Sequence, residues 1–232
     1  LAEAILSGLG YGSGRVVVLD DRDPAVLEAR LWALADAEAI APASFLPMGA
    51  KRERLWLALG HLHDAAPAPV DRLPLPPGAP FGAVAVDTKG CTLCLACVGA
   101  CPTGALRDNR DKPQLGFQES ACIQCGLCRA TCPESVITLV PRIDFTSAAR
   151  ATAVLNEEEP FACIRCGKPF GVAATVERIV ERLSGHAMFA GDAAALDRIR
   201  MCEDCRVAVQ FEAPAPLAGR PRPKPRTADD VD

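Results

Sequence analysis

The sequence of 232 residues is poor in several features, and each scarcity excludes a class of protein. No apolar run reaches the roughly 18 residues that are needed to span a bilayer, so we expect no transmembrane segment. Residues 1–6 lack the basic region and cleavage site of a signal peptide, and the chain begins without an initiator methionine, which indicates a fragment or a processed product. The formal net charge of −4 gives no reason to expect a nucleic-acid-binding protein.

Catalytic motifs are missing as well. The sequence holds neither a Gly-x4-Gly-Lys-Ser/Thr phosphate-binding loop nor a Gly-x-Ser-x-Gly nucleophile elbow. His61 and His63 lie two residues apart on a predicted helix, so they face different directions and cannot bind one metal together. His186 follows the predicted end of a helix, where a surface cation is the ordinary role. We therefore expect no catalytic site and no small-molecule substrate.

Cysteine, in contrast, is abundant, with twelve residues in the chain. An even number of cysteines is also what a secreted disulfide scaffold requires. All twelve, however, fall into Cys-x2-Cys and Cys-x3-Cys spacings, which suit the ligation of metals and are poorly placed for long-range cross-links. The reducing cytosol is therefore the expected compartment, and peripheral attachment to a membrane complex stays open.

Eight of the cysteines form two equal runs, each followed by proline. The runs are Cys91-x2-Cys94-x2-Cys97-x3-Cys101-Pro102 and Cys122-x2-Cys125-x2-Cys128-x3-Cys132-Pro133. Three thiolates at i, i+3 and i+6 let one tight loop reach three corners of an iron–sulfur cube, and the fourth corner needs a cysteine from farther away. Residues 81–141 resemble a bacterial-type ferredoxin with two [4Fe–4S] clusters, as found in iron–sulfur subunits associated with formate dehydrogenases and hydrogenases.

The resemblance implies which cysteines hold each cluster. In two-cluster ferredoxins the fourth cysteine of each run ligates the other cluster. The first cluster would then be held by Cys91, Cys94, Cys97 and Cys132. The second cluster would be held by Cys122, Cys125, Cys128 and Cys101. Because every iron then has a cysteine ligand, no coordination site remains open to a substrate, and the clusters serve to pass single electrons.

The expected fold class is α+β, built around a ferredoxin-like dicluster domain over residues 81–141. The apolar pattern predicts strands at 81–86 and 136–140, and a hairpin whose arms, 105–107 and 114–117, flank a polar turn. Each half of the domain would consist of a strand, a cysteine loop, a short helical turn and a strand. The domain should therefore be pseudo-twofold, with short antiparallel strands and short helices.

Residues 1–64 read as a partial α/β segment. The β-branched run 16–19 predicts a buried strand, Asp23-Pro24 predicts a helix start, and 51–63 predicts a further helix. The glycines at 10, 12 and 14 precede the strand, whereas a dinucleotide-binding loop must follow one, so they predict a turn. The segment weakly resembles the tail of the small iron–sulfur subunit of methyl-viologen-type hydrogenases. Residues 65–80 contain six prolines and predict a stiff, extended linker.

The last four cysteines form a different pattern. They are two Cys-x2-Cys pairs separated by 35 residues: Cys163, Cys166, Cys202 and Cys205. Two such pairs are typical of a structural zinc site, and helices near 172–183 and 192–200 would fill the span. A third iron–sulfur cluster and free or bonded thiols are the alternatives. The sequence Cys-Ile-Arg-Cys-Gly-Lys-Pro-Phe also resembles a segment of some hydrogenase- and formate-dehydrogenase-associated subunits.

These features define the expected domains and function. A connector over 142–160 leads to a four-cysteine, zinc-knuckle-like module at 161–212 and to a disordered basic tail at 213–232. We expect an iron–sulfur electron-transfer protein with redox donor and acceptor subunits as partners, within a larger oxidoreductase complex. One alternative is a redox-sensing regulatory protein that binds a partner or nucleic acid through the zinc knuckle and tail. The other is a redox enzyme with an additional cofactor in the N-terminal segment.

Overall fold

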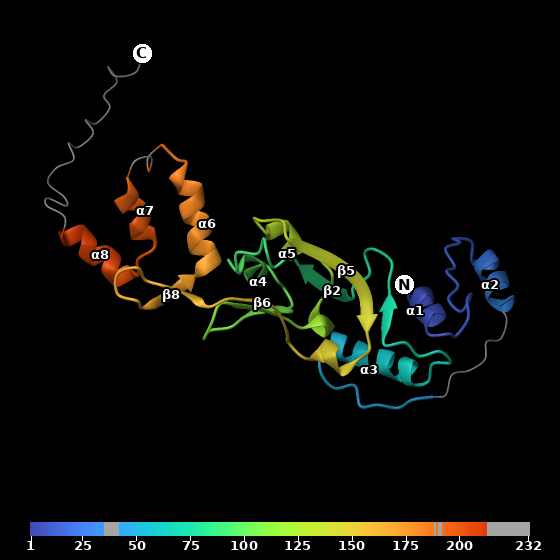
Figure 1. The fold of residues 1–232 in the computed structure, drawn as a ribbon. Helices are drawn as coiled ribbons and strands as arrows, with labels where there is room; N and C mark the ends of the chain where they lie inside the picture. The colour runs from blue at the N-terminus through green and yellow to red at the C-terminus, as the bar shows by residue number, and fades with distance from the viewer. Residues whose placement is uncertain (35–41, 188, 190–191, 213–232) are drawn as a thin grey trace, which may run out of the picture. The chain divides into compact units, whose positions relative to one another are not determined.

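The computed structural model describes residues 1–34, 42–187, 189 and 192–212 (Figure 1). The chain divides into an N-terminal unit, Leu1–Glu157, and a C-terminal unit, Glu158–Asp232. Short helices and small antiparallel sheets make up both units, which confirms the predicted α+β class. No helix among the described residues is long and apolar enough to cross a membrane.

The centre of the N-terminal unit consists of two small sheets and two short helices. Strand β2 (Gly82–Val86) pairs antiparallel with β5 (Ile137–Asp144), so that Gly82 faces Pro141 and Val86 faces Ile137. The hairpin of β3 (Leu106–Asp108) and β4 (Gln114–Phe117) forms the second sheet together with β6 (Ala153–Glu157). Helices α4 (Ala96–Gly99) and α5 (Leu127–Thr131) lie within the two cysteine runs. The sequence predicted these four strands and the hairpin but missed β6, which lies in the predicted connector.

The proline-rich segment differs from the predicted linker over 65–80. Its residues Arg72–Pro74 form strand β1, which pairs with β5 at the edge of the first sheet, and Leu73 faces Ile143. Leu73 and Leu75 are buried. An edge strand tolerates prolines because one of its sides needs no hydrogen-bond donors. The leucines between the prolines therefore hold the segment in the core, although its backbone is extended as expected.

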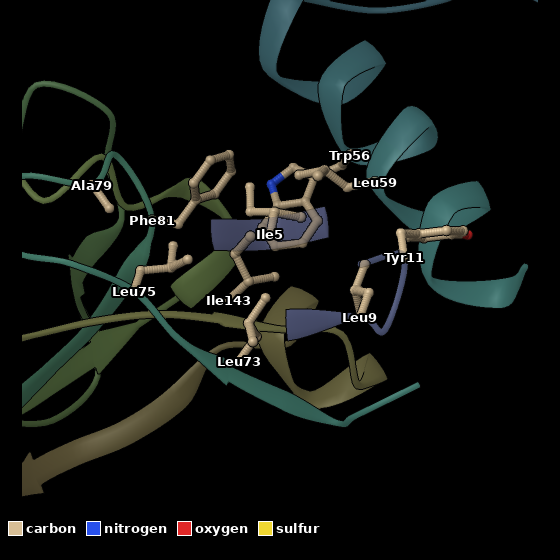
Figure 2. Packing of buried hydrophobic residues seen from close by; sticks show 10 residues of the cluster. All are labelled: Ile5, Leu9, Tyr11, Trp56, Leu59, Leu73, Leu75, Ala79, Phe81 and Ile143. Atoms are coloured by element: carbon tan, nitrogen blue, oxygen red, sulfur yellow. The ribbon is translucent and has the colours of Figure 1, made fainter. Parts of the chain in front are cut away.

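Helices α1 (Ala2–Gly8) and α3 (Lys51–Asp64) share a single hydrophobic core with the first sheet (Figure 2). Leu9 and Ile143 are fully buried in it, and the rings of Trp56 and Phe81 meet edge to face with centroids 5.7 Å apart. The buried members are Ile5, Leu9, Tyr11, Trp56, Leu59, Leu73, Leu75, Ala79, Phe81 and Ile143. Helices α1 and α3 are thus packed onto the ferredoxin-like sheet and do not form a separate α/β body.

The strand predicted over 16–19 is wrong. These residues have no regular secondary structure, and Val16, Val17 and Val18 are exposed. A strand needs a paired neighbour, and within residues 1–34 and 42–64 the structure provides none. The helix start predicted at Asp23 is confirmed: α2 (Pro24–Trp32) begins there, and the Asp23 carboxylate accepts from the Ala25 N–H at 3.0 Å.

The C-terminal unit carries a two-stranded sheet and three helices among its described residues. Strands β7 (Pro160–Ala162) and β8 (Pro169–Val172) form a hairpin. The predicted helices near 172–183 and 192–200 are present as α6 (Ala173–Ser184) and α7 (Ala193–Ile199), and Val176 and Val180 of α6 are buried. Helix α8 (Glu203–Glu212) was not predicted. The tail predicted at 213–232 lies outside the described residues.

Candidate metal centres

The first cavity in the N-terminal unit is lined by cysteines from both runs. They are Cys91, Cys94, Cys97 and Cys132, the four that the sequence assigns to the first cluster. Apolar side chains such as Leu93, Leu115 and Ile137 complete most of the wall, and the space inside it, together with the open solvent at its mouth, is about 370 Å³. Thiolates inside an apolar shell are what an iron–sulfur cluster requires, because such a shell keeps water from the sulfur atoms.

A second cavity repeats this arrangement with the roles of the runs exchanged. It is lined by Cys122, Cys125, Cys128 and Cys101, the four assigned to the second cluster. Val84, Phe117 and Leu139 belong to its apolar wall, and its empty space of about 330 Å³ is close to that of the first cavity. Two cavities of similar size and chemistry fit two clusters of the same kind.

The cysteine loops share an unusual backbone conformation at matching positions. Two residues after the first cysteine, Leu93 and Gln124 have φ angles of 50° and 55°. Four residues after it, Leu95 and Gly126 have φ angles of 58° and 79°. A left-handed conformation costs a non-glycine residue about 1 kcal/mol or more. The chain accepts this strain in both loops, which is typical of backbone that positions a functional site.

Three of the cysteines that line these cavities resist ionisation because they are partly buried. Burial, followed by the neighbouring Cys91 and Cys94 thiols, raises the pKa of Cys97 to about 11. Burial also raises the pKa values of Cys122 and Cys128. Ligation of iron requires the thiolate, so cluster binding must displace protons from these residues.

Cys101 differs from its neighbours. Burial acts against its ionisation, but backbone N–H groups of Leu106, Thr103 and Ala105 outweigh burial and lower the pKa of Cys101. Its environment is therefore already suited to a thiolate. These N–H groups belong to residues 103–106, which directly follow the first cysteine run.

Two residues of α3 contact the backbone at the start of the second cysteine run, and no sequence pattern predicted either contact. Trp56 Nε1 donates to the Ser120 carbonyl at 2.9 Å, and Arg52 Nε donates to the same oxygen at 2.7 Å. Ser120 belongs to the 3-10 helix Glu119–Ala121, immediately before Cys122. Both contacts join residues more than sixty positions apart, so local sequence patterns could not reveal them.

The four cysteines of the C-terminal unit converge on one point. Cys163 and Cys166 lie in the turn between β7 and β8, while Cys202 precedes α8 and Cys205 lies in its first turn. Their Sγ atoms all lie within 4.8 Å of one another, and those of Cys166 and Cys202 are 3.7 Å apart. Among the described residues, no other group of three or more His, Cys, Asp or Glu ligands is gathered in this way.

These distances fit one tetrahedral metal ion. With Zn–S bonds of about 2.3 Å, a tetrahedron of four sulfur atoms has edges of about 3.8 Å. An iron–sulfur cube instead binds each thiolate at a different iron, which spreads the four sulfur atoms more widely. The site therefore favours a mononuclear centre over a third cubic cluster.

The four cysteines of the C-terminal site cannot all ionise easily, because their thiolates repel one another. Burial disfavours the Cys163 thiolate, but backbone N–H groups of Cys202, Cys166 and Arg165 outweigh it and lower the pKa of Cys163 to about 6. Burial, together with hydrogen bonds to the other three cysteines, raises the pKa of Cys205 to about 12. The Cys163 thiolate therefore forms readily and disfavours ionisation of Cys205. A bound cation would offset the repulsion between the two negative charges.

Comparison with known proteins agrees with the geometry of the N-terminal unit. Residues 90–137 match the family model of the 4Fe-4S dicluster domain, and the match includes both cysteine runs. This part of the chain is therefore a two-[4Fe–4S] ferredoxin-type domain, which indicates iron–sulfur electron transfer. No curated protein matches the chain. The protein combines this dicluster domain with a separate four-cysteine metal site.

Proposed function

We propose that the protein relays single electrons through two [4Fe–4S] clusters as a subunit or domain of a larger oxidoreductase complex. The observation that carries the proposal is the pair of cavities, each lined by three cysteines of one run and the last cysteine of the other. The dicluster family match supports the same function. When bound, the clusters supply one-electron chemistry with little change in structure.

We propose the following ligands for these clusters. Cys91, Cys94, Cys97 and Cys132 hold the first cluster, and Cys122, Cys125, Cys128 and Cys101 hold the second. Within each set the middle cysteine of the run is exposed, namely Cys94 and Cys125. The exposed thiolates mark the places at which redox partners can approach each cluster, while the apolar walls keep water away from the remaining sulfur atoms.

The setting within a larger complex is supported by the segments that surround the dicluster domain. Helix α2 buries none of its residues, and Trp32 is 85% exposed. Exposed apolar residues of this kind are typical of contact with another protein. The resemblance to iron–sulfur subunits of formate dehydrogenases and hydrogenases makes complexes of that kind the proposed host, in a reducing compartment such as the cytosol.

We further propose that the four cysteines of the C-terminal unit bind one structural Zn²⁺. Four thiolates without an open position are typical of structural rather than catalytic zinc. The unit has a small core, so a bound ion would replace part of the missing hydrophobic stabilisation. A single iron ion also accepts four thiolates in tetrahedral geometry, so the metal must be identified directly.

Metal and acid-labile sulfide content per chain tests both proposals. We expect about eight irons, about eight sulfides and one zinc after anaerobic purification or reconstitution. About twelve irons with no zinc would contradict the zinc proposal, and so would a ninth iron in its place. Fewer than eight irons in a fully reconstituted sample would contradict the two-cluster proposal.

A further inference from the structure

Arg52, in the first turn of α3, places its guanidinium group against the backbone around the second cysteine run. Its Nε donates to the Ser120 carbonyl at 2.7 Å, its Nη1 to the Pro80 carbonyl at 3.0 Å and its Nη2 to the Cys122 carbonyl. The group also lies over the Phe81 ring, 4.8 Å from the centroid. Phe81 itself is fixed in the core beside Trp56 (Figure 2). These contacts hold a cation beside Cys122, a residue of the second cavity.

The charge of Arg52 is not neutralised by a nearby carboxylate. Within the described residues its partners are neutral carbonyl groups and a ring, and no acidic side chain forms an ion pair with it. Glu119, which lies close to Cys122 in the sequence, is instead held by Arg142 through hydrogen bonds of 2.8 and 2.7 Å. Arg52 is half-buried, so solvent screens its charge less than that of an exposed residue.

The electrostatic coupling between Arg52 and the second cavity is mutual. Burial lowers the pKa of Arg52, and the Cys122 thiolate acts in the opposite direction. Burial is the largest influence on the pKa of Cys122 and raises it. Arg52 acts in the opposite direction and favours the thiolate. The guanidinium group therefore stabilises negative charge at this sulfur atom.

The first cavity has a different charge environment. A half-buried carboxyl group, that of Glu134, belongs to its wall, and no lysine or arginine does. Lys89, the cation closest to the first run in the sequence, is exposed and follows Asp87. No charged side chain among the described residues lines the second cavity. Arg52 contacts the backbone carbonyl of Cys122, a residue of the cavity wall, without lining the cavity itself.

We propose that Arg52 raises the reduction potential of the second cluster, so that a single electron resides mainly on the cluster held by Cys101, Cys122, Cys125 and Cys128. This inference rests on the proposed function, because both clusters must be bound. Reduction transfers one electron from a one-electron donor protein to the cluster, and no bond is formed or broken. The cluster and its thiolates then carry one more negative charge, which a fixed cation stabilises. Arg52 is a positioning and tuning residue and does not touch the cluster's iron.

The test is an anaerobic redox titration of the full chain, followed by low-temperature EPR of both clusters. Arg52→Gln should lower one midpoint potential and leave the other unchanged; each tenfold change in the one-electron equilibrium corresponds to 59 mV. Arg52→Lys keeps the charge and should restore most of the shift. The matched control is Arg54→Gln, which removes the same charge from an exposed position of α3 and should move neither potential.

Two further variants show which cluster Arg52 affects and provide a second test if Arg52→Gln loses its structure. In a Cys94→Ala background only the second cluster should remain, and Arg52→Gln must lower that remaining potential. Glu119→Gln removes a negative charge close to Cys122 in the sequence, while Arg142 keeps its ion pair with Asp144 at 4.0 Å. This variant should shift the same cluster in the opposite direction, upward, even if Arg52→Gln does not retain its clusters.

The outcomes separate this inference from the function on which it rests. Two retained clusters with unchanged potentials in both Arg52→Gln and Glu119→Gln would overturn the role of Arg52. A shift confined to the first cluster would overturn it as well. If the unsubstituted chain itself binds no pair of clusters after reconstitution, the proposed function fails before any variant is compared.

Discussion

The dicluster domain and the C-terminal four-cysteine site both gather cysteine side chains, but they arrange them differently. In the dicluster domain, two separate cavities are each lined by four cysteines within a mainly apolar wall. In the C-terminal unit, four Sγ atoms lie within 4.8 Å of one another and leave space for one ion. The C-terminal sulfur atoms are close enough together for one tetrahedral ion, whereas the cysteines of the dicluster domain line two separate cavities.

The two regions also differ in what supports them. The dicluster domain has apolar cavity walls and shares a ten-residue hydrophobic core with α1 and α3. The C-terminal unit buries Val176, Val180 and Ala195 along with Cys163 and Cys202. We therefore expect metal removal to affect the folding of the C-terminal unit more than that of the N-terminal unit.

The largest expected effect is the loss of the C-terminal metal. Cys202→Ala should abolish tight metal binding, because structural zinc sites of this type contribute on the order of 10 kcal/mol of apparent binding free energy. Hydrogen exchange should then show rapid exchange in α6 and α8, whereas the iron–sulfur absorbance should persist. Ile164→Ala, an exposed substitution in the same knuckle, is the control and should retain the metal. Full protection of α6 in metal-free protein would contradict the expectation.

A smaller effect is expected at the edge of the first sheet. The buried Asp144 carboxylate accepts from Arg72 Nε at 2.8 Å and from the Thr146 N–H at 2.9 Å. Asp144→Asn should lower the free energy of unfolding of the N-terminal unit by about 2 kcal/mol, the usual value for hydrogen bonds to a charged group. Urea unfolding monitored anaerobically measures this loss. Asp71→Asn, an exposed position near the same strand, should change little.

The Asp144 carboxylate also makes the stability of the N-terminal unit depend on pH. Burial acts to raise the pKa of Asp144, but hydrogen bonds from Arg72 and Thr146 hold it below its usual value. A group with a lowered folded pKa stabilises the protein above its unfolded pKa of about 3.9, and this stabilisation is lost as the pH falls from there through the folded pKa. Asp144→Asn should therefore flatten the decline in stability below about pH 4. An unchanged decline would show that other carboxyl groups cause it.

The smallest effect concerns the strained backbone of the second cysteine loop. Gly126 has a φ of 79°, and an added Cβ would meet only ordinary contacts, the nearest being Leu139 Cδ1 at 3.6 Å. Gly126→Ala should cost about 1 kcal/mol because of the left-handed backbone alone. Gly99→Ala is the matched control in α4: its Cβ would meet nothing within 4 Å, so stability should stay equal or rise by about 0.5 kcal/mol. Equal losses in the two variants would argue against backbone strain.

The sequence was informative wherever chemistry depends on local spacing. The apolar pattern around the cysteine runs predicted the strands of the two pairs. The ferredoxin resemblance carried by the x2-x2-x3 runs implied the two sets of four cysteines that line the cavities. The Cys-x2-Cys pairs predicted that the four C-terminal cysteines would meet, and the apolar period of α6 predicted its helix. Thiolates that bind one centre from a single loop must lie close together in the sequence, so such sites can be recognised from the sequence alone.

Long-range packing could not be predicted in this way. Prolines at 74, 76 and 77 indicated a linker, yet Leu73 and Leu75 bind the segment to the edge of a sheet. The run 16–19 has the composition of a strand but lacks a partner to pair with in the described chain. Arg52 contacts the backbone of a residue seventy positions away, which only the tertiary structure reveals.

The exchange of the last cysteine between the two runs is the central claim, and low-temperature EPR of the reduced protein tests it most directly. Three variants are compared: Cys132→Ala, Cys94→Ala and Cys125→Ala. The account predicts that Cys132→Ala removes or alters the same cluster signal as Cys94→Ala and spares the signal that Cys125→Ala removes. If Cys132→Ala instead alters the signal that is lost in Cys125→Ala, each run holds its own cluster and the account is wrong.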